Sequence, residues 1–362
     1  MNAPTILISP LNWGFGHAGR MIPLALDLKR HGCEIVFAAD PQLIPLVEKE
    51  LPGIRLIEIR GMRIRYSHLL PQYISIFLQL PLIICSSIRE NHTLRHLAKQ
   101  IRPAVIISDN RFGFYHRDIF SVYVTHQLRI PFPTALRFME PLAAWLHGMI
   151  IKRYDLCLVP DYPGEVNLSG RLSHGLKLSG NVQYMGPLSR FTIAGEEEKR
   201  IIPQRSHYCL ILSGPEPQRS ILMEKVKEAL HGRELVIMSA EPVKESYDTT
   251  TGVTCLIRPD NMTMRSIIAG STIIIARSGY TSVMELTSMG KGAVLIPTPG
   301  QPEQEYLGRY LNGRHGFVTL GQKQICDIGS LPSGCTDNES MPLPDGNLFL
   351  EKVIKALLDY KI

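Results

Sequence analysis

Residues 257–311 read IRPDNMTMRSIIAGSTIIIARSGYTSVMELTSMGKGAVLIPTPGQPEQEYLGRYL and contain two strand-like runs. The runs are TIIIA (272–276) and AVLIP (293–297), which are short and apolar, as buried strands are. Each run is followed by a glycine-containing turn and then by a helical pattern. This alternation is typical of a parallel sheet that is covered by helices.

The same alternation fills the rest of the chain in two blocks. The first block has the runs TILIS (5–9), EIVFAA (34–39), AVIIS (104–108), VYVT (122–125) and LCLVP (156–160). The second adds YCLILS (208–213), LVIMS (235–239) and TCLI (254–257), after a charged stretch at 195–206. We predict an α/β protein with Rossmann-like domains at 1–190 and 203–345, and a C-terminal helix within 346–362 that packs on the first domain.

Length and composition agree with two ordinary domains. The chain has 362 residues, 44% hydrophobic and 20% charged, which excludes a disordered or collagen-like protein. The start, MNAPTILISP, lacks the basic and apolar regions of a secretory signal, so we expect a cytoplasmic protein. The seven cysteines form no C-x-x-C pair, lie mostly in apolar runs and are interpreted as buried thiols.

Positive charge is concentrated in the first half. Residues 1–190 hold 21 Lys and Arg against 13 Asp and Glu, a net charge of +8, whereas the rest carries −2. The sequence has no zinc-finger spacing or RNA-binding signature, so nucleic acid is not an expected partner. An anionic membrane surface or a phosphorylated substrate fits the charge equally well.

One apolar segment interrupts the alternation. Residues 69–88, LLPQYISIFLQLPLIICSSI, contain Pro71 and Pro81 and are poorly suited to span a membrane. Two interpretations stay open: a buried helix pair, and an interfacial anchor. The arginines that flank the segment are Arg60, Arg63, Arg65, Arg89 and Arg95.

A glycine-rich loop follows the first strand. Gly14, Gly16 and Gly19 match the dinucleotide fingerprint G-x-G-x-x-G, and Asp40 ends the second strand. This match is also typical of nicotinamide-dependent enzymes. In that motif the first glycine follows the strand directly, whereas here residues 10–13 intervene and bulky aromatic side chains would fill the pyrophosphate site.

We favour a loop whose glycines let the backbone approach a ligand closely. His17 stands in this loop at the start of the first helix and at the carboxyl end of a strand, where open sheets bind ligands. A histidine there is a candidate base, because its ordinary pKa lies near neutrality. Asp109 and His126 also follow predicted strands and rank second and third as the base.

The second glycine turn, Arg277-Ser278-Gly279-Tyr280-Thr281, leads from a strand into a helix. Backbone N–H groups and the helix dipole make such a turn an anion site without a metal. Glu285 lies about one turn into this helix, where its carboxylate could accept hydrogen bonds from two sugar hydroxyls.

These residues resemble the C-terminal domain of the family 28 glycosyltransferases, most clearly over 253–320. In the first half, residues 14–23 resemble the glycine-rich acceptor loop of the same family. The resemblance implies a GT-B fold, in which two Rossmann-like domains face one another across a cleft. It also implies an inverting, metal-independent transfer from a nucleotide-diphosphate sugar to an acceptor hydroxyl, with a UDP-sugar as the expected donor and no cofactor besides that co-substrate.

The resemblance assigns roles residue by residue. It places the catalytic base at His17 and the acceptor loop at Gly14, Gly16 and Gly19. The expected donor-binding residues are Ser213, Gly214, Ile257, Met262, Arg277, Ser278, Gly279, Thr281, Glu285, Gln304 and Glu305. Arg277 or Arg258 could meet the charge of the leaving diphosphate. The sequence has no D-x-D pair, the motif that metal-dependent transferases use.

Two other functions are compatible with this architecture: a sugar-nucleotide 2-epimerase and a catalytically idle sugar-nucleotide-binding protein. For the transferase, the basic first half and residues 69–88 suggest a lipid-linked or membrane-borne acceptor. We therefore expect a cytoplasmic protein at the inner face of a membrane.

Overall fold

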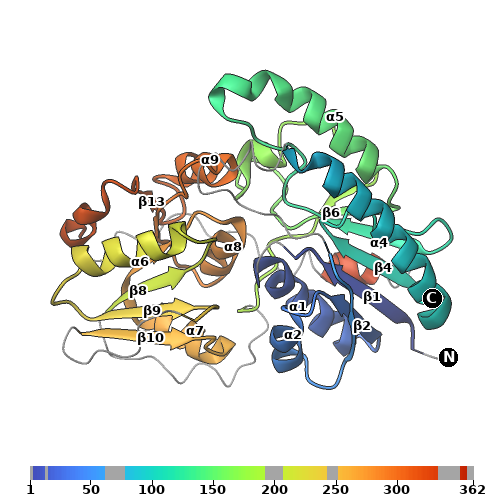
Figure 1. Cartoon of the computed structure of the whole chain (residues 1–362), viewed down its shortest axis with the longest axis horizontal. Helices are drawn as coiled ribbons and strands as arrows, with labels where there is room; N and C mark the ends of the chain where they lie inside the picture. The colour runs from blue at the N-terminus through green and yellow to red at the C-terminus, as the bar shows by residue number, and fades with distance from the viewer. Residues whose placement is uncertain are drawn as a thin grey trace. The chain divides into compact units, whose positions relative to one another are not determined.

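The computed structural model describes residues 3–12, 15–61, 78–191, 207–242, 252–332 and 351–356. The chain forms two compact units (Figure 1). Unit 1 comprises Met1–Ser189 and Leu343–Ile362, and unit 2 comprises Arg190–Pro342. Each unit is built around its own parallel sheet, so the predicted α/β class is confirmed.

Unit 1 contains a seven-stranded sheet in the order β3-β2-β1-β4-β5-β6-β7. All neighbouring strands in it pair in parallel. The strands are β1 (Thr5–Pro10), β2 (Glu34–Ala39), β3 (Arg55–Glu58), β4 (Val105–Asp109), β5 (Phe120–Val124), β6 (Leu156–Val159) and β7 (Val182–Tyr184). Its longer helices are α1 (Phe15–Arg30), α2 (Ile44–Glu50), α4 (Leu80–Ile101) and α5 (Glu140–Ile151).

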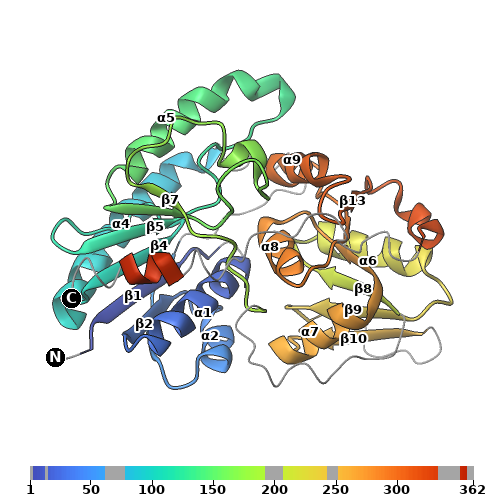
Figure 2. The ribbon, with the colours of Figure 1, turned by 180° about the vertical axis from the view of Figure 1, so that it is seen from behind.

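The two faces of this sheet are covered by different helices. Side chains alternate between the faces of a strand, so Ile6 and Ile8 of β1 pack with α1 and α2. Val353 and Ile354 of the helix at 351–356 are buried in the same cluster, and Figure 2 shows this red helix against the sheet. The intervening Leu7 packs on the opposite face with α4.

Unit 2 contains a six-stranded parallel sheet in the order β10-β9-β8-β11-β12-β13. Its strands are β8 (His207–Leu212), β9 (Leu235–Ser239), β10 (Val253–Ile257), β11 (Ser271–Ala276), β12 (Val294–Leu295) and β13 (Val318–Thr319). Its helices are α6 (Gln218–Ala229), α7 (Asn261–Gly270), α8 (Tyr280–Ser288) and α9 (Pro302–Leu311). The predicted apolar runs form the inner strands β8, β9, β11 and β12, and TCLI forms β10 at one edge of the sheet.

Each sheet has one point at which the strand order reverses. In unit 1 the reversal lies between β1 and β4, and in unit 2 between β8 and β11. The carboxyl end of an open parallel sheet binds ligands at such a point, because the two connections diverge there. Asp109 is the last residue of β4, Ser213 directly follows β8, and Ser278 lies in the turn after β11. His17 lies in the first turn of α1, the helix that follows β1.

The structure also corrects one interpretation of the apolar segment. Residues 69–77 lie outside the described residues, but 78–88 are described and mostly begin α4. Leu78, Leu82, Ile84 and Ile88 are exposed there. The interpretation as a buried helix pair is therefore wrong for this part, because α4 is buried only through its later residues. The interpretation of the cysteines as buried thiols is also wrong for Cys85 of this helix and for Cys326, which are exposed. None of the described helices is long and apolar enough to cross a bilayer.

Candidate active site

The first site is built around the beginning of α1. This helix starts at Phe15, so Gly16, His17 and Gly19 lie in its first turns and not on a loop before it. Gly14, the first glycine of the expected acceptor loop, lies outside the described residues. The helical placement points His17 toward the end of β4, because α1 begins beside the β1–β4 pair.

His17 contacts the carboxylate of Asp109. The His17 Nδ1 atom lies 3.1 Å from Asp109 Oδ2. Asp109 is the last residue of β4 and pairs in register with Pro10 of β1. Asn110 then turns the chain away in the left-handed conformation, with φ of 54°. The site thus joins two of the three residues predicted as the base.

Arg20 connects these residues with His126. It lies one helical turn after His17 and donates hydrogen bonds to both carboxylate oxygens of Asp109. Its Nη1 lies 3.0 Å from His126 Nδ1, and its Nη2 lies 2.9 Å from His17 Nδ1. His126 follows β5, so four side chains from three neighbouring segments form one polar cluster.

Exposure separates the roles that these groups can play. The His17 side chain keeps 17% of its surface exposed, whereas that of Asp109 keeps none. Burial would raise the pKa of the Asp109 carboxyl, but Arg20 and His17 outweigh it and hold the pKa at about 2. Burial lowers the pKa of His17 below its ordinary value, although Asp109 opposes this. At neutral pH the cluster therefore presents a neutral imidazole beside a buried carboxylate.

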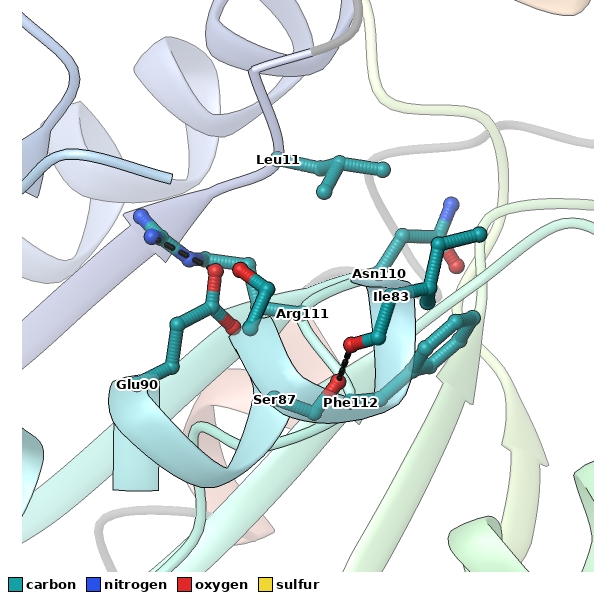
Figure 3. Close-up of a pocket in the computed structure, with 8 residues that line it drawn as sticks. Leu11, Ile83, Ser87, Glu90, Asn110, Arg111 and Phe112 are labelled. Carbon is teal, nitrogen blue, oxygen red and sulfur yellow. Dashed lines mark hydrogen bonds and ion pairs between the residues drawn. The ribbon is translucent and has the colours of Figure 1, made fainter. Parts of the chain in front are cut away.

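A small pocket lies between α4 and the turns after β1 and β4 (Figure 3). Its walls are the first half of α4 and the turns after β1 and β4, including Leu11, Ile83 and Asn110. Arg111 in the second turn donates from Nη2 to Glu90 of α4 at 2.9 Å, and both side chains are buried. This ion pair ties α4 to the turn that immediately follows Asp109.

The second site is the turn between β11 and α8 in unit 2. Gly279 precedes the first residue of α8 in an extended conformation, and no side chain caps the helix. The N–H groups of the first turn are therefore available to an anion. Ser278 is buried, and its hydroxyl donates to the Gln304 carbonyl at 2.8 Å. Thr281 is half-buried in the first turn of α8.

Glu285 is paired with an arginine. Arg190 donates from Nε to Glu285 Oε1 at 2.7 Å and from Nη2 to Oε2 at 3.3 Å. Arg190 is the first residue of unit 2, and its side chain is mostly covered. The two hydrogen bonds fix the orientation of the carboxylate.

Gln304 and Glu305 both support the turn after β12. The Gln304 side chain accepts a hydrogen bond from the Thr298 N–H at 2.9 Å. Glu305 accepts from the Gly300 N–H at 2.9 Å. Both expected donor contacts lie at the same edge of the sheet as Ser278, because α9 begins directly after this turn.

The Arg277 guanidinium is directed into the interior. It is almost fully buried and donates to the carbonyls of Gln218, Ile296 and Pro297 and to the Gln322 side chain. Burial lowers its pKa to about 10, so it stays a cation at neutral pH. These contacts hold α6, β12 and the segment after β13 together behind the helix turn.

The remaining expected donor residues lie at neighbouring strand ends. Ser213 and Gly214 follow β8, and Gly214 has φ of 105°, which favours glycine. Ile257 ends β10 and Met262 begins α7, and both apolar side chains are exposed. Arg258 donates to the Ala240 carbonyl at 3.0 Å. No three metal-ligating side chains gather anywhere in the described segments.

Two residues of these sites escaped the sequence analysis. Arg20 lies three residues after His17, so the helical spacing alone would have placed both on one face of α1. Arg190 precedes the charged linker and gives no such signal, because its partner Glu285 is 95 residues away.

The match to a known family falls on unit 2. Residues 250–326 match the glycosyltransferase family 28 C-terminal domain. An uncharacterized glycosyltransferase of Methanosarcina acetivorans is 24% identical over 328 residues, covering 83% of this chain and 81% of the relative. The UDP-N-acetylglucosamine–N-acetylmuramyl-(pentapeptide) pyrophosphoryl-undecaprenol N-acetylglucosamine transferase of Rhodopseudomonas palustris is 26% identical over 121 residues, covering 33% and 30%.

Solved structures with the same fold cover nearly the whole chain. The spinosyn rhamnosyltransferase SpnG, complexed with thymidine diphosphate, has a TM-score of 0.57 at 17% identity, covering 98% of this chain and 92% of SpnG. A UDP-N-acetylglucosamine 2-epimerase homologue from Listeria monocytogenes has a TM-score of 0.62 at 13% identity, covering 99% and 97%. The fold is GT-B, and the protein is a glycosyltransferase. Its unit 2 carries a family 28 C-terminal domain, so the resemblance found in the sequence is confirmed.

Proposed function

We propose that the protein transfers a sugar from a UDP-sugar to an acceptor hydroxyl with inversion and without a metal ion. The observation that carries this proposal is the contact between His17 and the buried carboxylate of Asp109 at the reversal point of unit 1. A neutral imidazole with one nitrogen oriented by a carboxylate is the arrangement of a general base.

In the proposed reaction His17 removes the proton of the acceptor hydroxyl. His17 Nδ1 lies near both Asp109 Oδ2, which only accepts, and Arg20 Nη2, which only donates, so it can form a hydrogen bond with one of them at a time. Because Nη2 already donates to Asp109 Oδ1, we assign the proton to Nδ1, with Asp109 Oδ2 as its acceptor. This assignment leaves the Nε2 lone pair for the acceptor hydroxyl. Asp109 is a poor base, because its pKa is about 2 and its side chain has no exposed surface. We therefore assign Asp109 to the orientation of His17 and to the stabilisation of the imidazolium.

The leaving nucleoside diphosphate gains negative charge as the sugar–phosphate bond breaks. We assign its binding to the N–H groups at the start of α8, where the helix dipole favours an anion. We assign Ser278 and Arg277 to the support of this turn and not to direct contact with the diphosphate. Their polar groups are already bonded to Gln304 and to backbone carbonyls. The exposed Ile257 and Met262 would cover the nucleotide base.

Glu285 is proposed to accept hydrogen bonds from the ribose hydroxyls of the donor, with Arg190 holding its carboxylate. Glu285→Gln should raise the KM for the donor by about 10- to 100-fold, the range for lost hydrogen bonds to a charged group. The KM for the acceptor should change little. Initial-rate kinetics with each substrate varied in turn will measure both constants. Glu224→Gln, an exposed acid on α6, is the control, and equal effects of both variants would contradict the assignment.

We also propose that the acceptor is lipid-linked and that unit 1 binds an anionic membrane surface. The relative from Rhodopseudomonas palustris supports a lipid-linked acceptor, because it is an N-acetylglucosamine transferase whose name includes pyrophosphoryl-undecaprenol. Two helical segments on unit 1 present exposed apolar side chains. These residues are Leu78, Leu80, Leu82, Ile84 and Ile88 at the start of α4, and Phe138, Leu142, Trp145, Leu146 and Met149 on η1 (Thr134–Met139) and α5.

Charge and composition favour a membrane as the partner of this apolar surface. The acid of α5, Glu140, is buried and accepts from Arg171 at 2.9 Å. Exposed cations lie at both helices: Arg89, Arg95, Arg137, Lys152 and Arg153. Apolar residues with tryptophan and flanking cations are typical of interfacial helices on anionic lipid.

The membrane proposal predicts vesicle binding through α5. The full chain should sediment with vesicles of phosphatidylcholine and phosphatidylglycerol at low salt, and Trp145→Glu should lose most of this binding. In a Trp13→Phe background Trp145 is the sole tryptophan, since the chain has 2, and its emission should shift to the blue on binding. Leu178→Glu changes an exposed leucine outside these helices and is the control. No sedimentation of the unchanged protein would favour an acceptor free in solution.

A further inference from the structure

Arg20 occupies the centre of the polar cluster in unit 1. Its side chain is 1% exposed, and it lies on α1 between the carboxylate of Asp109 and the rings of His17 and His126. Burying a cation is costly unless it is paired and its N–H groups are bonded. The described contacts of Arg20 account for all three nitrogens of its guanidinium.

The pairing with Asp109 is bidentate. Arg20 Nε donates to Oδ2 at 2.9 Å, and Nη2 donates to Oδ1. A fork of this kind fixes the plane of the carboxylate as well as its position. Oδ2 is also the oxygen that lies next to His17 Nδ1. The two hydrogen bonds from Arg20 therefore fix the position of the oxygen that contacts the His17 imidazole.

The contact with His126 determines where that ring carries its proton. An arginine can only donate hydrogen bonds. Among the described contacts, His126 Nδ1 at 3.0 Å is the partner of Nη1, whereas Nη2 also donates to Asp109. We therefore assign a lone pair to His126 Nδ1, which places the proton of the neutral ring on Nε2. A histidine with Nδ1 occupied in this way is a hydrogen-bond donor at its other nitrogen, and the ranking of His126 as a third candidate base loses its support.

We propose that Arg20 is a positioning residue of the reaction: its guanidinium holds Asp109 in the one orientation that binds His17 and keeps His126 in the donor form. This inference rests on the proposed function, because it explains how the proposed base, His17, is held in place by Arg20 and Asp109. Arg20 itself contacts neither sugar nor acceptor in this assignment. It acts through Asp109, as a second residue behind the His17–Asp109 pair.

Arg20 and Asp109 act on His17 in opposite directions. The described charged or titratable groups that face His17 are Asp109 from β4, Arg20 from α1 and His126 after β5. Asp109 raises the pKa of His17, whereas Arg20 and His126 lower it. Arg20→Gln should therefore move the titration of His17 to higher pH, and Asp109→Asn should move it to lower pH. A residue that only filled space would produce neither shift.

The decisive measurement is the ¹⁵N NMR titration of histidine-labelled full-length protein without substrate, with the His17 signal assigned from His17→Gln. The unchanged protein should show His17 protonated at Nδ1 and His126 at Nε2 when both are neutral. Arg20→Gln should raise the midpoint of His17 and reduce kcat by about 100-fold, the cost of misplacing a reacting group. The donor KM should stay within about twofold, because the expected donor contacts lie in unit 2.

Arg20→Lys is the second variant, and it keeps the positive charge without the fork. It should leave the His17 midpoint near that of the unchanged protein but still lower kcat, because the carboxylate is no longer held at two points. An unmoved or lowered midpoint in a folded Arg20→Gln protein would overturn the inference, and so would full activity of Arg20→Lys. The titration of His17 does not depend on catalysis. If the His17 midpoint shifts as expected but the protein shows no transferase activity, the proposed function is rejected and the positioning role of Arg20 is retained.

Discussion

His17→Ala is expected to lower kcat by about 10² to 10⁴-fold, the contribution of a positioned general base. The KM for the donor should hardly change, because the expected donor residues belong to unit 2. The reason for the loss is geometric: of the two groups in the His17–Asp109 pair, His17 alone has exposed surface from which to reach an acceptor. Steady-state kinetics with saturating donor will measure the effect.

Two further variants make this test specific. His17→Gln keeps the size and hydrogen bonding of the side chain but cannot take the proton, so the loss should remain. His31→Gln changes an exposed histidine of unit 1 and should leave the rate unchanged. If His17→Gln recovers more than about a tenth of the rate, the residue orients groups and is not the base.

Asp109→Asn should reduce kcat by up to about 10⁴-fold, as expected when an amide replaces the carboxylate that orients a catalytic histidine. The rate of the unchanged enzyme should rise with pH through the pKa of His17, which lies below 6.5, and then stay level. Asp109 raises that pKa, so its replacement should move the acidic limb of the kcat profile to lower pH. A pH profile of both proteins checks the direction. A limb that moves to higher pH would contradict the assignment.

The central strands and the edge strand β10 could be predicted from the sequence, whereas the other three edge strands could not. β1, β2, β8 and β11 are continuous apolar runs because both faces of each strand are covered. β3, β7 and β13 lie at edges of the two sheets and are only partly buried, so β3 reads RLIE and β7 reads VQY. A strand with one solvated side carries no uninterrupted apolar signal.

The residues at the strand ends could be predicted in part for a similar reason. His17, Asp109 and Ser278 all follow strands that the pattern identified, and parallel strands bring their carboxyl ends to one edge. The contact between His17 and Asp109 could not be predicted, because it joins residues 92 positions apart in the sequence. The same holds for Arg190 and Glu285. Side-chain pairing across such distances depends on the packed fold and not on local pattern.

The exposed face of α4 shows where composition alone misleads. An apolar segment is most often buried, yet Leu82, Ile84 and Ile88 are exposed along the first half of this helix. The later half packs on the sheet through Leu94 and Ala98, and the ion pair of Glu90 with Arg111 lies at the transition. Hydrophobicity gives the amount of apolar surface but not what covers it.

The most direct test of the account is the product formed from a panel of nucleotide sugars. The full chain would be incubated in EDTA with UDP-, dTDP- and GDP-sugars and with vesicles that contain an acceptor lipid with a free hydroxyl, either a lipid alcohol or a sugar linked to polyprenyl diphosphate. The products would be identified by mass spectrometry. The account predicts one UDP released for each glycosylated acceptor, with an inverted anomeric centre, and loss of both products in His17→Gln while the donor still binds. An epimerised sugar nucleotide without glycosylated acceptor, or equal turnover by His17→Gln, would contradict it.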